Sequence, residues 1–150
     1  MERKVTQVAP TAVAIQKRKR VAAYARVSCG SEEMLHSLAA QVSYYSGLIQ
    51  KNPEWEYAGV FADEAETGTK DTRPEFQRLI DECRNGKVDI VLVKSISRFA
   101  RNTVTLLETV RELKALGIDV FFEEQKIHSL SSEGELMLTI LAGFAQEGRA

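Results

Sequence analysis

Six residues, Val88-Asp89-Ile90-Val91-Leu92-Val93, decide the fold, because they form an apolar run in which only Asp89 is polar. A strand of this kind must be covered on both faces, as the central strands of a parallel sheet are by flanking helices. Residues 21–27 form a second apolar, β-rich run, and further strands are predicted at 54–63 and 118–122. The strands therefore predict a parallel sheet covered on both faces.

Helical patterns alternate with these strands. Apolar side chains recur at helical spacing in residues 37–50, and a second helix is predicted from Pro74 to about residue 86. A third helix runs from 103 to 116, where Gly117 stops it. Alternation of this kind predicts an α/β fold, a three-layer domain with a central, mostly parallel sheet.

Two helix starts carry the pattern of a capping box, in which a hydroxyl side chain and a glutamate three residues later cap each other's backbone. The first is Thr72 with Glu75, and the second is Ser132 with Glu135. The second pattern precedes a final helix with an apolar stripe through Leu136, Met137, Ile140, Leu141 and Phe144. We expect this stripe to belong partly to the core and partly to a dimer contact.

Length and composition suit a single domain that needs no disulfides, since the chain has 150 residues and 44% hydrophobic side chains. Cys29 and Cys83 lack metal-ligand spacing, and the chain shows neither an export signal nor an apolar run of membrane-spanning length. We expect a cytoplasmic protein with reduced thiols and no membrane association. Because the last helix is still apolar where the sequence stops, we also expect a fragment of a longer protein.

Charge is unevenly distributed along the chain. Residues 1–20 hold six basic side chains and one acidic one, while the whole chain has 20 basic and 21 acidic side chains. The remainder is therefore acidic, and it should not bind DNA strongly by itself, because nonspecific affinity comes from phosphate neutralisation. Residues 1–19, which lack periodicity and contain Pro10, are predicted to form a flexible basic arm.

Two stretches that contain arginine and serine lie at the carboxyl ends of predicted strands. Tyr24-Ala25-Arg26-Val27-Ser28 finishes the first strand, and Ser97-Arg98-Phe99-Ala100-Arg101 follows the third. The carboxyl ends of parallel strands meet at one edge, where ligands bind in open α/β sheets. If a helix begins by Ser97, Arg98 and Arg101 share one face at its positive N-terminus. Arginine forks match phosphate oxygens, so this edge predicts phosphate chemistry at Ser28.

The order of several motifs resembles the serine recombinases over residues 20 to 149. The matching elements are Tyr-x-Arg-Val-Ser (24–28), Ser-Leu-x-x-Gln (37–41), Arg-Pro-x-Phe-Gln-Arg-Leu (73–79) and Ser-Arg-Phe-Ala-Arg-Asn (97–102). The basic arm and the stretch from 94 to 103 are most similar to the large serine recombinases of conjugative transposons and phages. The resemblance implies a resolvase-like catalytic domain at 20–150, lacking the DNA-binding region.

The resemblance also implies a role for each matching residue. Ser28 would attack a DNA phosphodiester and leave a 5′-phosphoserine link, with Arg26, Arg73, Arg98 and Arg101 around the scissile phosphate. Tyr24 and Gln41 would support the site, and Thr67 and Gly68 would lie in a loop beside it. Ser97 stands where many members have Asp, and Gly148 stands where Glu usually precedes the arginine.

Further expectations concern cofactors and partners. One phosphoester replaces another in this reaction, so it implies neither a metal nor any other cofactor. Its implied partners are double-stranded DNA and further copies of the protein, a homodimer that assembles into a tetramer during strand exchange.

Other readings of the same residues stay open. The domain could be a noncatalytic phosphate- or DNA-binding α/β module, or a hydrolytic phosphoesterase using the same groups. Cys29 is interpreted as a packed thiol, His36 and His128 as surface residues, and the acids at 63, 64, 66 and 71 as solvated loop residues that hold no metal. The aromatic side chains at 44, 45, 55, 57 and 61 suit a helix and sheet core better than base stacking.

Overall fold

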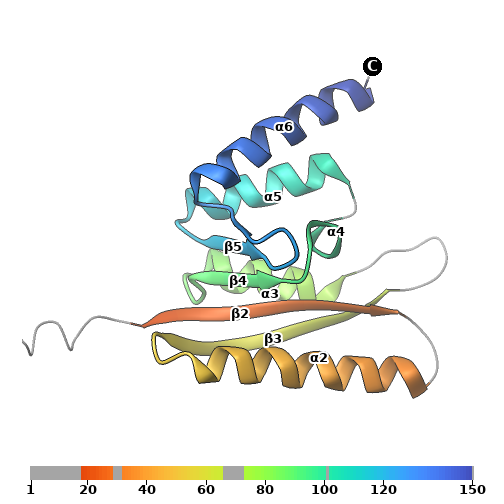
Figure 1. Cartoon of the computed structure of the whole chain (residues 1–150), viewed down its shortest axis with the longest axis vertical. Coiled ribbons are helices and arrows are strands. Elements are labelled where there is room, and N and C mark those ends of the chain that lie inside the picture. The colour runs from red at the N-terminus through yellow and green to blue at the C-terminus, as the bar shows by residue number, and fades with distance from the viewer. Residues whose placement is uncertain (1–17, 29–31, 66–72, 101, 150) are drawn as a thin grey trace, which may run out of the picture.

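The computed structural model describes the backbone of residues 18–28, 32–65, 73–100 and 102–149, and the side chains of these residues except 28, 32–37, 65 and 145–149. The predicted α/β alternation is present in this part of the chain (Figure 1). Its elements are β2 (Lys19–Ser28), α2 (Glu32–Lys51), β3 (Trp55–Ala65), α3 (Pro74–Arg84), β4 (Ile90–Val93), α4 (Ile96–Phe99), α5 (Thr103–Ala115), β5 (Asp119–Phe122), β6 (Ile127–His128) and α6 (Ser132–Arg149).

The five strands form one sheet in the order β3-β2-β4-β5-β6. Strands β3, β2, β4 and β5 are parallel to one another, and the two-residue β6 runs antiparallel to β5. The decisive apolar run supplies β4, which lies between β2 and β5 with its last three residues buried. The predicted fold class, a three-layer α/β domain with a mostly parallel sheet, is confirmed.

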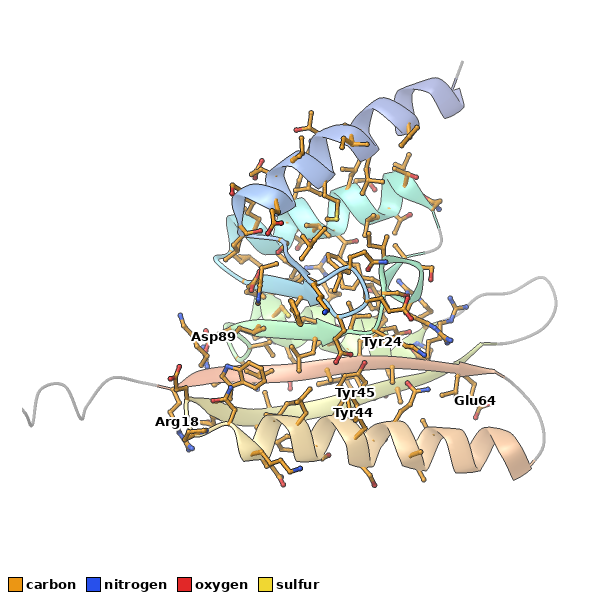
Figure 2. The ribbon with its side chains drawn as sticks, in the orientation of Figure 1. Arg18, Tyr24, Tyr44, Tyr45, Glu64 and Asp89 are labelled. Atoms are coloured by element: carbon orange, nitrogen blue, oxygen red, sulfur yellow. The ribbon has the colours of Figure 1, made fainter. Side chains whose placement is uncertain are left out.

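Helices cover the two faces of the sheet unequally. Helix α2 lies alone on one face, and α3, α5 and α6 lie on the other (Figure 1). Side chains along β2 alternate between the two cores, since Ala23 packs with Tyr45 of α2 and Tyr24 packs with the opposite layer. In Figure 2, Tyr24 and Tyr45 accordingly lie on opposite sides of β2. Side chains of β2 therefore contribute to the cores on both faces of the sheet.

The larger core is built around a row of aromatic rings. Tyr24, Phe76, Phe99 and Phe122 make successive edge-to-face contacts with centroid separations of 5.1, 5.2 and 5.8 Å. Such pairs contribute about 0.5–1.5 kcal/mol each beyond the area they bury. The row joins β2, α3, α4 and β5, so it fixes the short helix α4 against the sheet.

Asp89, the polar residue of the decisive run, has a structural partner. Its carboxylate accepts hydrogen bonds from the backbone amide of Arg20 at 2.8 Å and from Arg20 Nε at 3.0 Å. The hydrogen bond from the Arg20 side chain lowers the pKa of Asp89 despite partial burial, which acts in the opposite direction. This contact lies at the amino end of the sheet, away from the predicted site, and ties the start of β2 to the start of β4 (Figure 2).

Both predicted capping boxes are wrong. At α3 the N-cap position is Arg73, and the Glu75 carboxylate pairs with Arg78 Nη2 at 2.7 Å instead of capping the backbone. At α6 the capping hydroxyl belongs to Ser131, whose Oγ accepts from Gly134 N at 3.0 Å. In each case a tertiary partner or a neighbouring residue competes better for the helix amides than the local sequence pattern indicates.

Gly134 has no room for a side chain. A Cβ at this position would lie 2.3 Å from the carbonyl oxygen of His128 and 2.5 Å from that of Ser129. Gly134→Ala should therefore lower the free energy of unfolding by roughly 2 kcal/mol, because backbone must move to relieve the clash. Gly143→Ala, in the same helix with nothing within 4 Å of the new Cβ, should instead stabilise by about 0.5–1 kcal/mol. Urea unfolding of the two variants checks this, and equal effects would contradict it.

The apolar stripe of α6 is divided between core and solvent. Met137 and Leu138 are buried in the larger core, whereas Leu136, Ile140 and Phe144 are 62%, 51% and 60% exposed. The expectation that the stripe contributes partly to the core is confirmed. None of the described helices combines the length and the apolar character needed to cross a membrane.

Candidate active site

The carboxyl ends of β2 and β4 meet at one edge of the sheet. Their pairing ends where Tyr24 lies beside Val93, so β2 continues four residues further, to Ser28. Helix α4 follows β4 and contacts this projecting end of β2. The backbone of Ser28 thus lies at the predicted edge, while its side chain lies outside the described residues.

Arg26 and Arg98 come together at this edge, as the two sequence stretches predict. Arg26 is 9% exposed, and its carbonyl oxygen accepts a hydrogen bond from Arg98 Nη1. The guanidinium of Arg98 is therefore anchored to the backbone of β2, two residues before Ser28. Because a guanidinium has five N–H donors, it can hold this carbonyl and still contact an anion.

Arg73 contacts the backbone carbonyls of Arg98 and Phe99 and is packed among aromatic rings. Its Nη1 donates to the carbonyl oxygen of Phe99 at 2.7 Å, and its guanidinium carbon is 3.8 Å from the ring centre of Phe76. It also lies 5.5 Å from the ring centre of Tyr24. Arg73 therefore links the start of α3 to the backbone of α4.

Asp63 is the residue that sequence reasoning missed. It is 5% exposed, and its carboxylate accepts from the Tyr24 hydroxyl at 2.8 Å and from the amides of Glu75 and Phe76, each at 3.0 Å. It thus caps α3 from β3, and the reading of Asp63 as a solvated loop acid is wrong. Its spacing of two residues from buried Phe61, on the same face of the strand, was the available signal.

Of the other acids interpreted as solvated loop residues, at positions 64, 66 and 71, the structure describes only Glu64. Glu64 is exposed, and residues 66 and 71 lie outside the described part of the chain. No group of three or more His, Cys, Asp or Glu among the described residues is arranged to hold a metal ion.

Burial and the same contact both favour the neutral form of Tyr24. Burial raises the pKa of the Tyr24 phenol, and the hydrogen bond to the Asp63 carboxylate raises it further, against the opposing charge of Arg73. The phenol therefore remains a hydrogen-bond donor at neutral pH and does not act as a base.

The condition for a shared face of Arg98 and Arg101, one helix that begins by Ser97 and continues through both, is not met. Helix α4 is a single turn that ends at Phe99, and Ala100 is extended, with φ −148° and ψ 148°. Helix α5 starts separately at Thr103, where Asn102 Oδ1 accepts from Thr105 N at 2.8 Å. The described backbone therefore has no helix that continues from Ser97 through Ala100, and Arg101, Thr67 and Gly68 lie outside the described residues.

Two residues that are predicted to support the site, Ser97 and Gln41, occupy different surroundings. Ser97 is exposed, and its Oγ lies 3.0 Å from Ser95 Oγ. Gln41 is half-buried on α2 and lines a pocket of about 560 Å³ with Tyr44, Tyr45 and other residues. Gln41 therefore belongs to the α2 side of the sheet, whereas Tyr24 faces the opposite layer.

Of the remaining sequence interpretations, some agree with the structure and some do not. Burial raises the pKa of the Cys83 thiol to about 12, and His128 is exposed as predicted. Of the aromatic set, Tyr45 and Phe61 are buried core residues, but Tyr44 and Tyr57 are 56% and 41% exposed. Cys29 and His36 lie outside the described side chains.

Curated relatives with sequence similarity to this chain are transposon resolvases. The Tn3 resolvase of Escherichia coli is 28% identical over 130 residues, which cover 87% of this chain and 64% of the relative. The Tn21 resolvase of Escherichia coli is 32% identical over 110 residues, covering 68% of this chain and 58% of the relative. The chain thus spans less than two thirds of the length of these proteins.

Solved structures give the same relationship. A resolvase family site-specific recombinase from Streptococcus pneumoniae superposes with a TM-score of 0.71 at 30% identity, covering 88% of this chain and 89% of that one. The N-terminal catalytic domain of TP901-1 integrase matches with a TM-score of 0.62 at 29% identity, covering 87% and 97%. The family model described as "Resolvase, N terminal domain" matches residues 21–150. The chain therefore belongs to the resolvase N-terminal domain family.

Proposed function

We propose that residues 20–150 are the catalytic domain of a site-specific DNA recombinase that cuts and rejoins strands through Ser28. The observation that carries the proposal is the gathering of Arg26, Arg73 and Arg98 around the carboxyl end of β2, the strand that ends at Ser28. Arginine guanidiniums at the end of this strand suit an oxygen nucleophile that attacks a phosphodiester, because the transition state carries negative charge on the phosphate oxygens. Membership of the resolvase family supports the same chemistry.

In the proposed reaction the Ser28 oxygen forms a bond to the scissile phosphorus while the bond from phosphorus to the 3′ oxygen breaks. The serine loses its proton and the departing 3′ oxygen gains one, so the products are a 5′-phosphoserine ester and a free 3′-hydroxyl. Attack of a 3′-hydroxyl on the phosphoserine reverses these changes and rejoins the strands. Each step exchanges one phosphoester for another, so no external energy source enters the balance.

The arginines have different parts in this proposal. Arg98 and Arg26 contact the scissile phosphate, and Arg73 holds α4 in place while adding positive charge behind it. Tyr24 keeps the end of β2 in register through Asp63. By family resemblance, Arg101 joins the phosphate contacts, and Gln41, Ser97, Thr67 and Gly68 support the site.

The proposed partners are double-stranded DNA and further copies of the protein. The exposed apolar side chains Leu136, Ile140 and Phe144 of α6 support a homodimer contact on that helix, which would pair into a tetramer during strand exchange. We place the protein in the cytoplasm, where its DNA substrate lies.

A covalent-adduct assay tests the function. The 150-residue chain is fused to a DNA-binding module of known target and incubated with paired target sites labelled at either strand end. After nuclease and trypsin treatment, the adduct should lie on the peptide of residues 27–51, because no Lys or Arg interrupts it before Lys51. Fragmentation by mass spectrometry then distinguishes Ser28 from Ser31, Ser37, Ser43 and Ser46.

Each result of this assay decides between the alternatives. A 5′-linked adduct on Ser28 supports the recombinase. Cut DNA without attached protein overturns it in favour of a hydrolytic phosphoesterase. Bound but intact DNA overturns it in favour of a noncatalytic binding module.

Arg98→Ala is expected to slow adduct formation by about 10²–10³-fold, the usual cost of removing one donor to a developing oxyanion. Arg98→Lys should recover only part of the rate, because lysine keeps the charge but loses the fork. The matched control is Arg78→Ala, which removes an exposed arginine whose partner is Glu75 and should leave the rate unchanged. Single-turnover kinetics at saturating DNA measure this, and equal rates for Arg98→Ala and Arg78→Ala would contradict the role of Arg98.

A further inference from the structure

The turn between β5 and β6 makes contacts that the proposed chemistry leaves unexplained. Glu123 in this turn accepts two phenolic hydrogen bonds from α2, from Tyr45 at 2.6 Å and from Tyr44 at 3.1 Å. Tyr45 is 2% exposed, whereas Tyr44 is 56% exposed. One carboxylate therefore joins the turn to helix α2 through a buried and an exposed hydroxyl, and Figure 2 shows both tyrosines rising from α2 towards the sheet.

The same turn holds the backbone that leads into Arg98. The amide of Glu123 donates to the carbonyl oxygen of Val93 at 2.9 Å, and the amide of Glu124 donates to that of Lys94 at 2.8 Å. Gln125 Oε1 accepts from the amide of Ile96, the first residue of α4, at 3.3 Å. Three successive residues of the turn thus hold consecutive parts of the segment 93–96.

These contacts form a continuous connection from α2 to the arginine site. Arg98 lies two residues after Ile96 on a single-turn helix, so a displaced turn would move its guanidinium away from the carbonyl of Arg26. Burial and the Glu123 hydrogen bond raise the pKa of Tyr45, and the positive charge of Arg98 acts in the opposite direction.

We propose that Glu123 and Tyr45 are positioning residues that hold the segment 93–98, and with it Arg98, in the geometry for attack on the phosphate. This inference rests on the proposed function of Arg98. Neither residue contacts the reacting atoms, and both act through the β5–β6 turn. Positional errors of about 1 Å in a reacting group can cost about a hundredfold in rate, so this connection has a measurable effect.

The test compares two variants, Tyr45→Phe and Tyr44→Phe, each of which removes one hydroxyl group that donates to the Glu123 carboxylate. Tyr45→Phe keeps the buried ring and should slow adduct formation in the fused chain by about ten- to a hundredfold at saturating DNA, with DNA affinity unchanged and the melting temperature lowered by no more than about 4 °C. Tyr44→Phe loses an exposed hydroxyl to the same carboxylate and should change the rate by less than about twofold. The double variant Tyr45→Phe with Glu123→Gln should be no slower than the slower single variant, because the two residues act as a unit.

A second readout is independent of activity. Hydrogen exchange of peptides covering residues 93–99 should become faster in Tyr45→Phe, while exchange of α5 stays unchanged. If the wild-type chain forms adduct and Tyr45→Phe matches its rate, the positioning role is overturned and the recombinase function stands. If the wild-type chain forms no adduct, the proposed function fails, and unchanged exchange at 93–99 would overturn the positioning role separately.

Discussion

Ser28→Ala is expected to abolish covalent attachment to DNA, lowering it by about 10⁴-fold or more, because alanine has no atom that can form the ester. The backbone of β2 pairs with β3 through residue 28, and this pairing needs no side chain. The variant should therefore keep the melting temperature and the DNA affinity of the wild-type fusion. Denaturing gel analysis of end-labelled DNA measures the loss.

Two nearby substitutions serve as controls for this prediction. Ser31→Ala removes a hydroxyl three positions further along, and Cys29→Ala removes the adjacent thiol. Both should keep the adduct if Ser28 is the nucleophile. Loss of the adduct in Cys29→Ala together with its survival in Ser28→Ala would show instead that a thiol attacks the phosphate.

Asp63→Ala is expected to lower the free energy of unfolding by about 3 kcal/mol, the second large effect. The substitution leaves the buried Tyr24 hydroxyl and the amides of Glu75 and Phe76 without their acceptor. Loss of a helix N-cap costs about 1 kcal/mol, and a buried donor left unsatisfied costs about 1–3 kcal/mol more. Urea or thermal unfolding of the chain measures the total.

Graded variants separate the contributions to this effect. Asp63→Asn keeps one acceptor oxygen and should cost about half as much, and Tyr24→Phe removes only the phenolic donor and should cost about 1 kcal/mol. Glu64→Ala, at the next and exposed position, should stay within about 0.5 kcal/mol of wild type. A loss in Asp63→Ala no larger than that in Glu64→Ala would contradict the capping role.

The sheet and its helices could be predicted from the sequence because each depends on local periodicity. The apolar run at 88–93 and the alternation of strands with helices specify a parallel sheet wherever they occur. The two-residue β6 and the four-residue α4 could not be predicted, since neither is long enough for an apolar pattern to repeat. The ring of Phe99, the last residue of α4, packs between Phe76 and Phe122, and local sequence does not specify these tertiary contacts.

The site could be predicted only where strand ends determine it. Arg26 and Arg98 meet because β2 and β4 are parallel neighbours, a consequence of topology. The roles of Asp63 and Glu123 depend on side chains that meet across 39 and 78 residues, and no spacing rule reports such pairs. Both are acids that composition alone would assign to solvent.

The irregular edge strand β3 has a consequence for handling the protein at high concentration. Its register against β2 shifts between Val21 and Ala22, and Gly59 there adopts φ 124°, a conformation that other residues rarely reach. A flat, eleven-residue edge would offer its unpaired backbone groups to the edge of another molecule. The bulge twists this edge and breaks its hydrogen-bonding repeat, so β3 is a poor template for intermolecular strand pairing and aggregation.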